Sequence, residues 1–393
     1  MNLLLITSSY PDPQATTHSG GGVFVEHFAR ELAKGEHVVV LTQQVGRKNV
    51  AGAGRSGLEI IRFPWNGRGK PLSNLKLPRD FRLIASVMCN GFLASLKAAK
   101  KHEIDHTLAI WALPSGIWAL GLKLIMGIPY ATWSLGSDIW NYKGNFFSRM
   151  LLRIILHEAD KCYADGYQLK SDVESIARKR CKFLSTSRYL PDKIEKKACV
   201  KPDRKNYLFI GRYHPNKGPD VLLKAIAKLS PVHDNDVHFH LFGEGYLKPE
   251  LEDFIEKNQL EDIVSLNGYI EERLAVAYLT ACDALIIPSR IESIPVVLSD
   301  ALKTGSKIIA TDVGDMGYLL KKFRAGVVVP PQSPEKLADV IENELAHETD
   351  PFAEGRKALL DLFDISNTVR AFVSDLDSTS DPADSGGGFE QSH

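Results

Sequence analysis

Two acidic residues in the stretch "SRIESIPVVLSDAL" have the setting of a binding site. Glu292 follows closely after an apolar run that predicts a strand, and Asp300 comes eight positions later within an otherwise apolar segment. A carboxylate in an apolar setting costs free energy unless a partner compensates it. Ser293 is a candidate helix cap, with Pro295 in the first turn, which would put Glu292 at the helix entrance and Asp300 about two turns inside. The alternative for Asp300 is an exposed position on an amphipathic helix.

A basic pair lies in a second stretch, "FIGRYHPNKG", between a predicted strand and a predicted helix. Gly211 allows the chain to turn tightly, and Arg212 and Lys217 place two cations at the carboxyl end of the strand. Two cations beside a helix N-terminus suit a diphosphate, both by charge and by the free N–H groups of the helix. Solvated loop charges are the alternative.

Two further loops are rich in glycine, which lets a backbone approach a ligand closely. The first, "HSGGGVFVEHF", contains Gly20, Gly21 and Gly22, and the second, "LFGEGYLKPEL", contains Gly243 and Gly245. Neither has the Lys-Ser/Thr of a Walker loop or the spaced glycines of a dinucleotide fingerprint. Each is a weak signal alone, because glycine runs also form flexible loops.

Strand-like runs alternate with helix-length amphipathic stretches along most of the chain, which predicts βαβ units and parallel sheets covered on both faces. We expect an α/β fold with two doubly wound, Rossmann-like domains that face each other across a cleft. The expected parts are a first domain at 1–190, a linker at 191–204, a second domain at 205–362, a C-terminal helix at 363–376 and a disordered tail at 377–393. Ligands of such sheets bind beyond the carboxyl ends of the strands.

The composition is that of a soluble globular protein, with 393 residues, 44% hydrophobic and 24% charged. Five scattered cysteines, an odd number without metal-ligand spacing, favour a reducing compartment. The start of the chain does not read as a signal peptide, and no uninterrupted apolar run reaches about 18 residues. We therefore expect a cytoplasmic protein with no nucleic-acid partner.

The charge is unevenly distributed, although the net charge is zero. Residues 1–190 contain 25 Lys and Arg against 14 Asp and Glu, a net charge of +11, and the remainder carries −11. The stretch "YKGNFFSRMLLRIILHEADK" combines Lys143, Arg149 and Arg153 with a strongly apolar face, and "ARKRCK" adds a second basic cluster. Basic amphipathic helices suit anionic membrane surfaces. A core-packed helix with solvated cations is the alternative.

Taken together, these stretches resemble the retaining, nucleotide-sugar-dependent glycosyltransferases of the GT-B fold, the large family that contains many bacterial polysaccharide and lipopolysaccharide transferases, sucrose synthase and mannosyltransferases. The resemblance extends to about residue 375. It rests on five motifs in order: "GGGVFVEHFARELAKGEHVVVLT", "WALPSGIWALGLKLIMGIPYATWSLGSDIW", "LFIGRYHPNKGPDVLLKAIAKL", "HLFGEGYLKPELE" and "LNGYIEERLAVAYLTACDALIIPSRIESIPVVLSDAL".

The resemblance implies a role for each matching charged residue. Arg212 and Lys217 match the basic pair that holds the donor diphosphate. Glu292 matches the acid that contacts the sugar hydroxyls, and Asp300 matches the second acid, which binds the ribose. The two carboxylates would thus be hydrogen-bond acceptors and not a metal site.

The resemblance also implies backbone contacts with the donor. Ser293 and Ile294 match residues whose amides meet the sugar and phosphate, and Gly20, Gly21 and Gly22 match the loop that closes over the donor. Gly211, Gly243 and Gly245, in the turns after two strands, complete the predicted donor-binding set.

This sequence departs from the family at two positions. The family usually has Glu where this chain has Asp300, whose side chain is one methylene shorter. In "SLGSD", Leu135 stands where the family commonly has His facing the donor sugar and acceptor. Either Ser137 and Asp138 provide the acceptor-side polar contacts, or the acceptor site is rearranged.

The implied reaction transfers a hexosyl group from a nucleotide diphosphate sugar, such as a UDP-sugar, to a glycan or lipid-linked glycan, with retention at the anomeric carbon. We expect neither a cofactor nor a metal, since the one Asp-x-Asp pair, Asp375 and Asp377, lies near the tail. Two alternatives stay open: another GT-B enzyme, such as a nucleotide-sugar epimerase or a phosphorylase, and a non-catalytic binding protein, which Leu135 favours.

Overall fold

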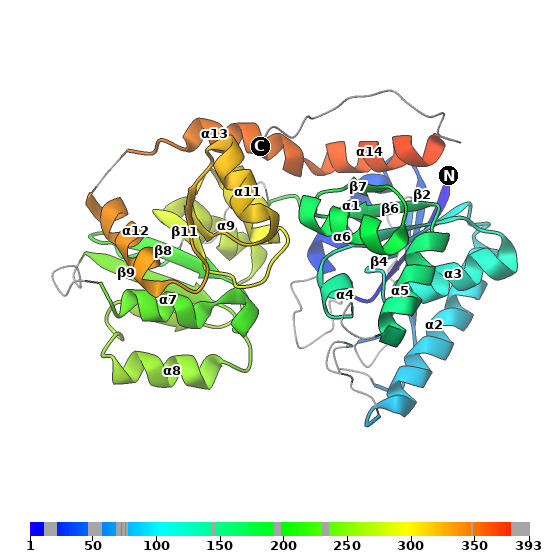
Figure 1. Cartoon of the computed structure of the whole chain (residues 1–393), viewed down its shortest axis with the longest axis horizontal. Helices are drawn as coiled ribbons and strands as arrows, with labels where there is room; N and C mark the ends of the chain where they lie inside the picture. The colour runs from blue at the N-terminus through cyan, green and yellow to red at the C-terminus, as the bar shows by residue number, and fades with distance from the viewer. Residues whose placement is uncertain are drawn as a thin grey trace.

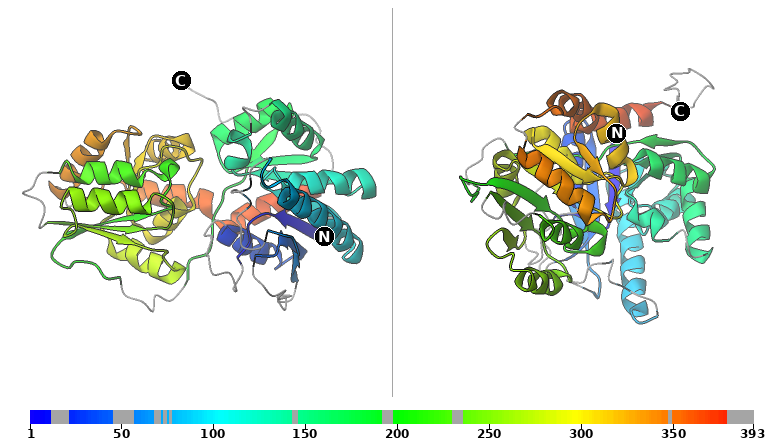
Figure 2. Two further views of the ribbon diagram at one scale, coloured as in Figure 1. Left: turned by 90° about the horizontal axis from the view of Figure 1, so that it is seen from below. Right: turned by 60° about the vertical axis from the view of Figure 1, so that its left-hand side comes forward.

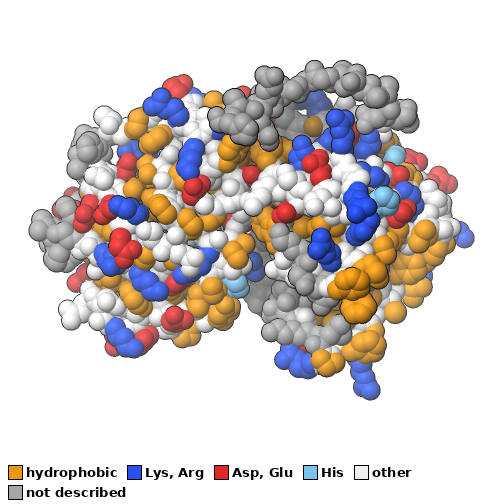
Figure 3. Space-filling view, viewed as in Figure 1, with side chains coloured by type: hydrophobic (Ala, Val, Ile, Leu, Met, Phe, Trp, Pro, Cys, Tyr) orange, Lys and Arg blue, Asp and Glu red, His pale blue; other side chains and the backbone are white. Residues whose placement is uncertain are grey.

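The protein folds into two α/β domains that lie side by side, as the computed structural model in Figure 1 shows. The structure describes residues 1–11, 22–45, 57–67, 72, 75, 78–142, 146–191, 198–229, 236–346 and 349–378. The space-filling view shows the domains as two lobes, with a notch between them at its lower edge (Figure 3).

The first domain contains a seven-stranded parallel sheet in the order β3-β2-β1-β4-β5-β6-β7. Its elements are β1 (Asn2–Thr7), α1 (Val23–Leu32), β2 (His37–Gln43), β3 (Leu58–Phe63), α2 (Phe81–Lys101), β4 (His106–Ile110), α3 (Ser115–Met126), β5 (Tyr130–Ser134), α4 (Ser137–Trp140), α5 (Phe146–Glu158), β6 (Lys161–Ala164), α6 (Tyr167–Ala177) and β7 (Cys181–Phe183).

The second domain repeats the arrangement with a six-stranded parallel sheet in the order β10-β9-β8-β11-β12-β13. Its elements are β8 (Lys205–Ile210), the 3-10 turn η3 (Pro215–Lys217), α7 (Pro219–Ile226), β9 (Val237–Phe242), α8 (Lys248–Lys257), β10 (Val264–Asn267), α9 (Glu272–Ala281), β11 (Ala284–Ile287), α10 (Val296–Thr304), β12 (Lys307–Thr311), α11 (Gly314–Phe323), β13 (Val327–Val329), α12 (Pro334–Ala346), α13 (Ala353–Leu360) and η5 (Asp361–Phe363).

Both faces of each sheet are buried, which explains why the strands read as continuous apolar runs. In β1, Leu4 and Ile6 face a core shared with α2, α3, α5 and α6, whereas Leu3 and Leu5 face a core shared with α1. In the second domain, α7, α8 and α12 cover one face and α9, α10, α11 and α13 cover the other.

The last helix, α14 (Ile365–Asp377), returns from the second domain to the first (Figures 1 and 2). Its apolar face joins the core above β1, where Phe372 packs against Phe28 and Tyr163. The Asp375 carboxylate accepts hydrogen bonds from Tyr163 and Lys182. The predicted Asp-x-Asp pair therefore begins with a residue that holds this helix to the first domain. Within the predicted linker and tail, residues 192–197 and 379–393 lie outside the described part.

By length and composition, α2 could cross a membrane, but it forms part of the first domain. It packs against β1, β2, β3 and α3, and Val87, Ala98 and Ala99 on it lie in the core.

In each sheet the strand order reverses beside the first strand of the domain, between β1 and β4 and between β8 and β11. These are the topological switch points where doubly wound sheets bind ligands. The predicted α/β fold of two Rossmann-like domains is confirmed.

Candidate active site

Lys217 and Glu292 meet at the switch point of the second domain. Lys217 ends the η3 turn after β8, Glu292 follows β11, and the Lys217 ammonium group donates a hydrogen bond to the Glu292 carboxylate. The two loops can approach this closely because residue 218 is glycine. Its φ of 67° lies in the left-handed region, and a Cβ there would lie 2.0 Å from the Pro288 carbonyl oxygen. The structure thus joins a predicted phosphate-binding cation and the predicted sugar-binding acid.

Arg290, which sequence reasoning missed, ties the same two loops together. Its guanidinium group forms a double ion pair with Asp220 at 2.7 and 2.6 Å and donates to the Pro215 carbonyl oxygen at 2.7 Å. Burial opposes ionisation of Asp220, but Arg290 outweighs it and lowers the pKa of that carboxyl group. The signal that could have identified Arg290 from the sequence was its positive charge two positions before Glu292.

Arg212 lies at the same edge and is exposed. Within the part of the chain that the structure describes, its guanidinium group forms no ion pair, so it is accessible to a ligand. The pKa of His214 is lowered by burial and then by Arg212 and Lys217, which indicates that positive charge concentrates at this loop. A diphosphate would be attracted to this concentration of charge.

The glycines after β8 and β9 are needed for packing between their loops. A Cβ at Gly243 would lie 1.9 Å from the Gly211 carbonyl oxygen, and a Cβ at Gly245 would lie 2.3 Å from the Tyr213 carbonyl oxygen. This close packing accounts for both residues without a ligand, and their predicted donor contact stays a prediction.

Only the last of the three consecutive glycines is described. Gly22 caps α1, and a Cβ there would lie 2.9 Å from the backbone between Ser9 and Tyr10, beyond the end of β1. Gly20 and Gly21 lie outside the described residues. Gly22 itself therefore lies against the segment after β1, at the switch point of the first domain.

The prediction that Ser293 caps the following helix is wrong. The helix α10 begins at Val296 with Pro295 at its N-cap and no side-chain cap. The Ser293 hydroxyl instead donates to the Asp165 carboxylate of the first domain at 2.8 Å. The Ile294 side chain is buried in the core between α10 and the sheet. The predicted amide contacts of Ser293 and Ile294 with the donor stay predictions.

Asp300 is buried and is bound by Arg188, a first-domain residue that sequence reasoning did not identify. Arg188 Nε lies 3.0 and 3.1 Å from the two Asp300 oxygens, and Nη2 lies 2.6 Å from one of them. Burial lowers the pKa of Arg188, but the Asp300 carboxylate outweighs it, so that pKa is raised. The ribose contact of Asp300 stays a prediction, and any such contact must be made beside Arg188.

Asp138 holds loops together and does not point into open space. Its carboxylate accepts backbone hydrogen bonds from Ala112 at 2.6 Å and Leu135 at 3.0 Å. Burial raises its pKa to about 6, against the effect of these bonds. Of the two predicted acceptor-side residues, Ser137 is exposed at the start of α4, whereas Asp138 braces the ends of β4 and β5. Leu135 packs partly into the core beside β1.

Trp111 is a third residue that sequence reasoning missed. It follows β4 directly and has a φ of 62°, a conformation that bulky residues rarely adopt. Its ring lies edge-on to that of Phe24 on α1, with centroids 5.9 Å apart. Strained backbone is concentrated at functional sites. The signal in the sequence was an aromatic residue immediately after a predicted strand.

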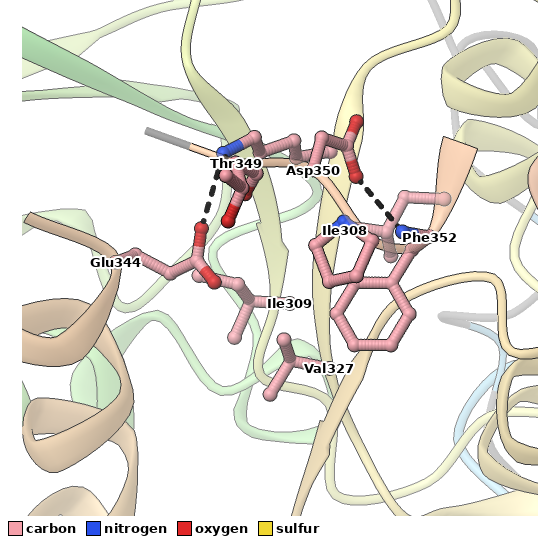
Figure 4. Close-up of a pocket in the computed structure, with 9 residues that line it drawn as sticks. Ile308, Ile309, Val327, Glu344, Thr349, Asp350 and Phe352 are labelled. Carbon is pink, nitrogen blue, oxygen red and sulfur yellow. Dashed lines mark hydrogen bonds and ion pairs between the residues drawn. The ribbon is translucent and has the colours of Figure 1, made fainter. Parts of the chain in front are cut away.

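The described residues contain no cluster of three or more His, Cys, Asp or Glu side chains that could hold a metal ion in place of this site. The pocket in Figure 4 is a small gap at the amino ends of β12 and β13, the edge of the sheet opposite the carboxyl ends. Asp350 accepts a hydrogen bond from the Phe352 amide in it, and Glu344 binds Lys307. The Glu344–Lys307 contact joins α12 to β12.

Comparison with known proteins agrees with this arrangement. Residues 204–347 match the family described as "Glycosyl transferases group 1". The chain is 28% identical over 370 residues to the putative teichuronic acid biosynthesis glycosyltransferase TuaC of Bacillus subtilis, covering 87% of this chain and 88% of that protein. Sucrose-phosphate synthase from Thermosynechococcus elongatus has a similar structure, with a TM-score of 0.75, 19% identity and coverage of 95% and 98%. Anabaena HepE in complex with UDP-glucose gives a TM-score of 0.69, 16% identity and coverage of 96% and 100%.

Proposed function

We propose that this chain, which matches glycosyltransferases in sequence and shares the GT-B fold, transfers a hexosyl group from a nucleotide diphosphate sugar to a glycan or lipid-linked glycan, with retention at the anomeric carbon. The observation that carries the proposal is the meeting of Lys217 and Glu292 beside the exposed Arg212 at the β8–β11 switch point. A diphosphate and a sugar are adjacent in the donor, as a cation and a carboxylate are adjacent here.

The chemistry needs charge stabilisation at the departing phosphate, where negative charge grows in an oxocarbenium-like transition state. Arg212 and Lys217 would supply it, and fixed donors of this kind stabilise transition-state charge effectively. On donor binding, Lys217 would exchange the Glu292 carboxylate for phosphate oxygens, and Glu292 would accept hydrogen bonds from the sugar hydroxyls. Because two side-chain cations serve the phosphate, we propose that the transfer is independent of divalent metal.

The comparisons guide the choice of substrates to test. HepE was crystallised with UDP-glucose, which makes UDP-hexoses the first donors to examine. TuaC is named for teichuronic acid biosynthesis, which supports a role in cell-surface polysaccharide synthesis. We propose the same class of role for this chain.

A lipid-linked acceptor is supported by an apolar and basic surface on the first domain, which we call the α5 face. On α5, Phe146 and Phe147 are each 75% exposed, and Met150, Leu151 and Ile154 are exposed beside them. Figure 3 shows hydrophobic side chains gathered on this domain.

Two features of the α5 face fit an anionic membrane surface. Arg149 and Arg153 are exposed among its apolar residues, and the first 190 residues are basic overall. The neighbouring helix α3 ends in three exposed apolar residues, Leu124, Ile125 and Met126, beside the C-terminal end of α5. Apolar side chains would enter the headgroup region while the arginines bind anionic lipid, as amphipathic helices do. Lys143, predicted for the same surface, lies outside the described residues.

The donor is tested first. UDP-glucose, UDP-galactose, UDP-N-acetylglucosamine and GDP-mannose are screened by thermal shift, and the best is incubated with a membrane glycolipid extract. Nuclear magnetic resonance of the product then reads the anomeric configuration. We expect binding of one nucleotide class and a product that retains the donor configuration.

Other results would contradict parts of this proposal. An inverted product would overturn the retaining mechanism. An epimerised sugar without acceptor would identify an epimerase, and phosphate-dependent release of sugar phosphate would identify a phosphorylase. Tight nucleotide binding without transfer or donor hydrolysis would favour a non-catalytic binding protein.

Membrane binding is tested by co-sedimentation with phosphatidylcholine vesicles that contain or lack phosphatidylglycerol. We expect binding to the anionic vesicles only, lost in a Phe146→Ser/Phe147→Ser variant and weakened in Arg149→Glu/Arg153→Glu. Tyr246→Ser, which removes an exposed aromatic ring from the second domain, is the matched control. Equal binding of all variants would exclude the α5 face as the contact surface.

A further inference from the structure

The end of β6 in the first domain touches the loop that carries Glu292. Asp165 follows β6 directly, and its Oδ1 atom accepts a hydrogen bond from the Ser293 hydroxyl at 2.8 Å. Both side chains are buried, each 4% exposed. Because Ser293 follows Glu292 immediately, a hydrogen bond from the opposite domain fixes the backbone next to the predicted sugar-binding acid.

A second set of contacts holds the same two segments together. Asp315, in the first turn of α11, accepts the backbone N–H of Gln168 at 3.0 and 3.1 Å and so caps the N-terminus of α6 from the opposite domain. A carboxylate is favoured at that position by the free N–H groups and by the helix dipole. Tyr167 lies edge-on to Tyr318 of α11, with ring centroids 6.2 Å apart.

Gly166 makes this close approach of the two domains possible, because it has no side chain. A Cβ at Gly166 would lie 2.3 Å from Asp315 Oδ2 and 2.4 Å from Ser293 Oγ. Its φ of −155° is ordinary extended backbone, so the local conformation does not require glycine. Glycine is required instead by the narrow space between the domains, because the side chain of any larger residue would push Ser293 and Asp315 away.

The other side of the Glu292 loop is supported from within the second domain. Gly314, with a φ of 52°, begins α11, and a Cβ there would lie 2.1 Å from the Glu292 carbonyl oxygen. The loop of Glu292 and Ser293 is thus clamped between Gly314 on one side and Asp165 with Gly166 on the other. Removing the first-domain half of this clamp would release the backbone that aims Glu292.

The charges around Asp165 are consistent with a contact that forms only when the domains meet. Burial raises the pKa of Asp165, the Ser293 hydrogen bond opposes that effect, and the carboxylates of Glu292, Asp138 and Asp315 add to it. Asp165 would be better solvated if the domains moved apart.

We propose that Asp165 is a positioning residue for glycosyl transfer, which acts across the domain boundary through the Ser293 hydroxyl to orient Glu292 toward the donor sugar. This inference rests on the proposed function. Domain closure would then also place the sugar-binding acid correctly. The nucleotide alone would contact only the second domain, so its binding should not depend on the Asp165–Ser293 hydrogen bond.

The test separates kcat from UDP affinity in four variants. Asp165→Ala and Ser293→Ala should each lower kcat about tenfold, the effect expected of one lost hydrogen bond of about 1–1.5 kcal/mol. Calorimetry should give an unchanged Kd for UDP. The double variant should be no worse than either single one, because both remove the same contact. Asp165→Asn keeps the acceptor oxygen and should retain most of the wild-type kcat.

Gly166 supplies an independent test of the same contact. Gly166→Ala should lower kcat and increase the radius of gyration measured by small-angle X-ray scattering, since the added methyl group separates the domains. Gly35→Ala is the matched control, because a Cβ at Gly35 has nothing within 4 Å. It should leave both quantities unchanged.

Two outcomes would overturn the inference, and they differ from failure of the proposed function. Wild-type kcat in Ser293→Ala would exclude the hydroxyl as the link. Loss of thermal stability and UDP affinity in parallel with kcat in Asp165→Ala would make the contact merely structural. If the wild-type protein itself transfers no sugar from any nucleotide donor, the proposed function fails first.

Discussion

The ion pair between Arg188 and Asp300 allows a ribose contact of Asp300 to be tested apart from its effect on stability. The two side chains are 15% and 2% exposed and meet through two nitrogens of the guanidinium group. Removing one partner of a buried pair costs about 3–5 kcal/mol, whereas replacing both by apolar residues is often neutral or stabilising. Arg188→Met and Asp300→Ala should therefore each destabilise the protein, and Arg188→Met/Asp300→Leu should recover most of that loss.

The four proteins should rank differently in UDP affinity than in stability. If Asp300 accepts hydrogen bonds from the ribose, Asp300→Ala and the double variant each lose about 1.5–3 kcal/mol of UDP binding. That corresponds to roughly tenfold to a hundredfold in Kd. Arg188→Met should bind UDP at least as tightly as the wild type, because the ribose hydroxyls then take the place of Arg188 as hydrogen-bond donors to the Asp300 carboxylate.

The assay combines urea unfolding with calorimetry of UDP binding for the same four proteins. A stable double variant that binds UDP weakly would establish the ribose role. A double variant that binds UDP as well as the wild type would refute it, and Asp300 would then serve only to join α10 to the segment after β7.

Four further predictions concern the reaction. Arg212→Ala and Lys217→Ala should each lower transfer about tenfold to a hundredfold in a folded protein, as loss of one charge-assisted hydrogen bond predicts, whereas the exposed control Lys257→Ala should not. Glu292→Gln should lower kcat more than it weakens UDP binding, and the opposite pattern would reverse its role. Activity should persist in chelator; loss restored by Mg²⁺ or Mn²⁺ would contradict metal independence. The pKa of Asp165 is raised where the two domains are in contact, so the closed arrangement favours the protonated form of its carboxyl group. Closure of the domains should therefore be most favourable below the ordinary aspartate pKa, and it should weaken as the pH rises through the raised pKa. A pH profile unchanged in Asp165→Asn would exclude this link.

The sequence was sufficient to predict the fold and to place both Lys217 and Glu292 just after strands of the second domain. Alternating strands and helices indicated two parallel sheets, and residues that follow neighbouring parallel strands must gather at one edge. Glu292 and Lys217 are 75 positions apart, but each follows a strand, and the pairing of β8 with β11 in the sheet brings the two residues together.

The partners of Asp300 and Ser293 were decided by the docking of the two domains. Asp300 binds Arg188 across 112 positions, and Ser293 binds Asp165 across 128. Local rules favoured a helix cap for Ser293, because capping depends only on nearby chain. Burial between the domains offered its hydroxyl a carboxylate instead, and a buried polar group must be paired. Which carboxylate meets which donor depends on how two separately folded surfaces fit, and strand and helix periodicity contain no information about that fit.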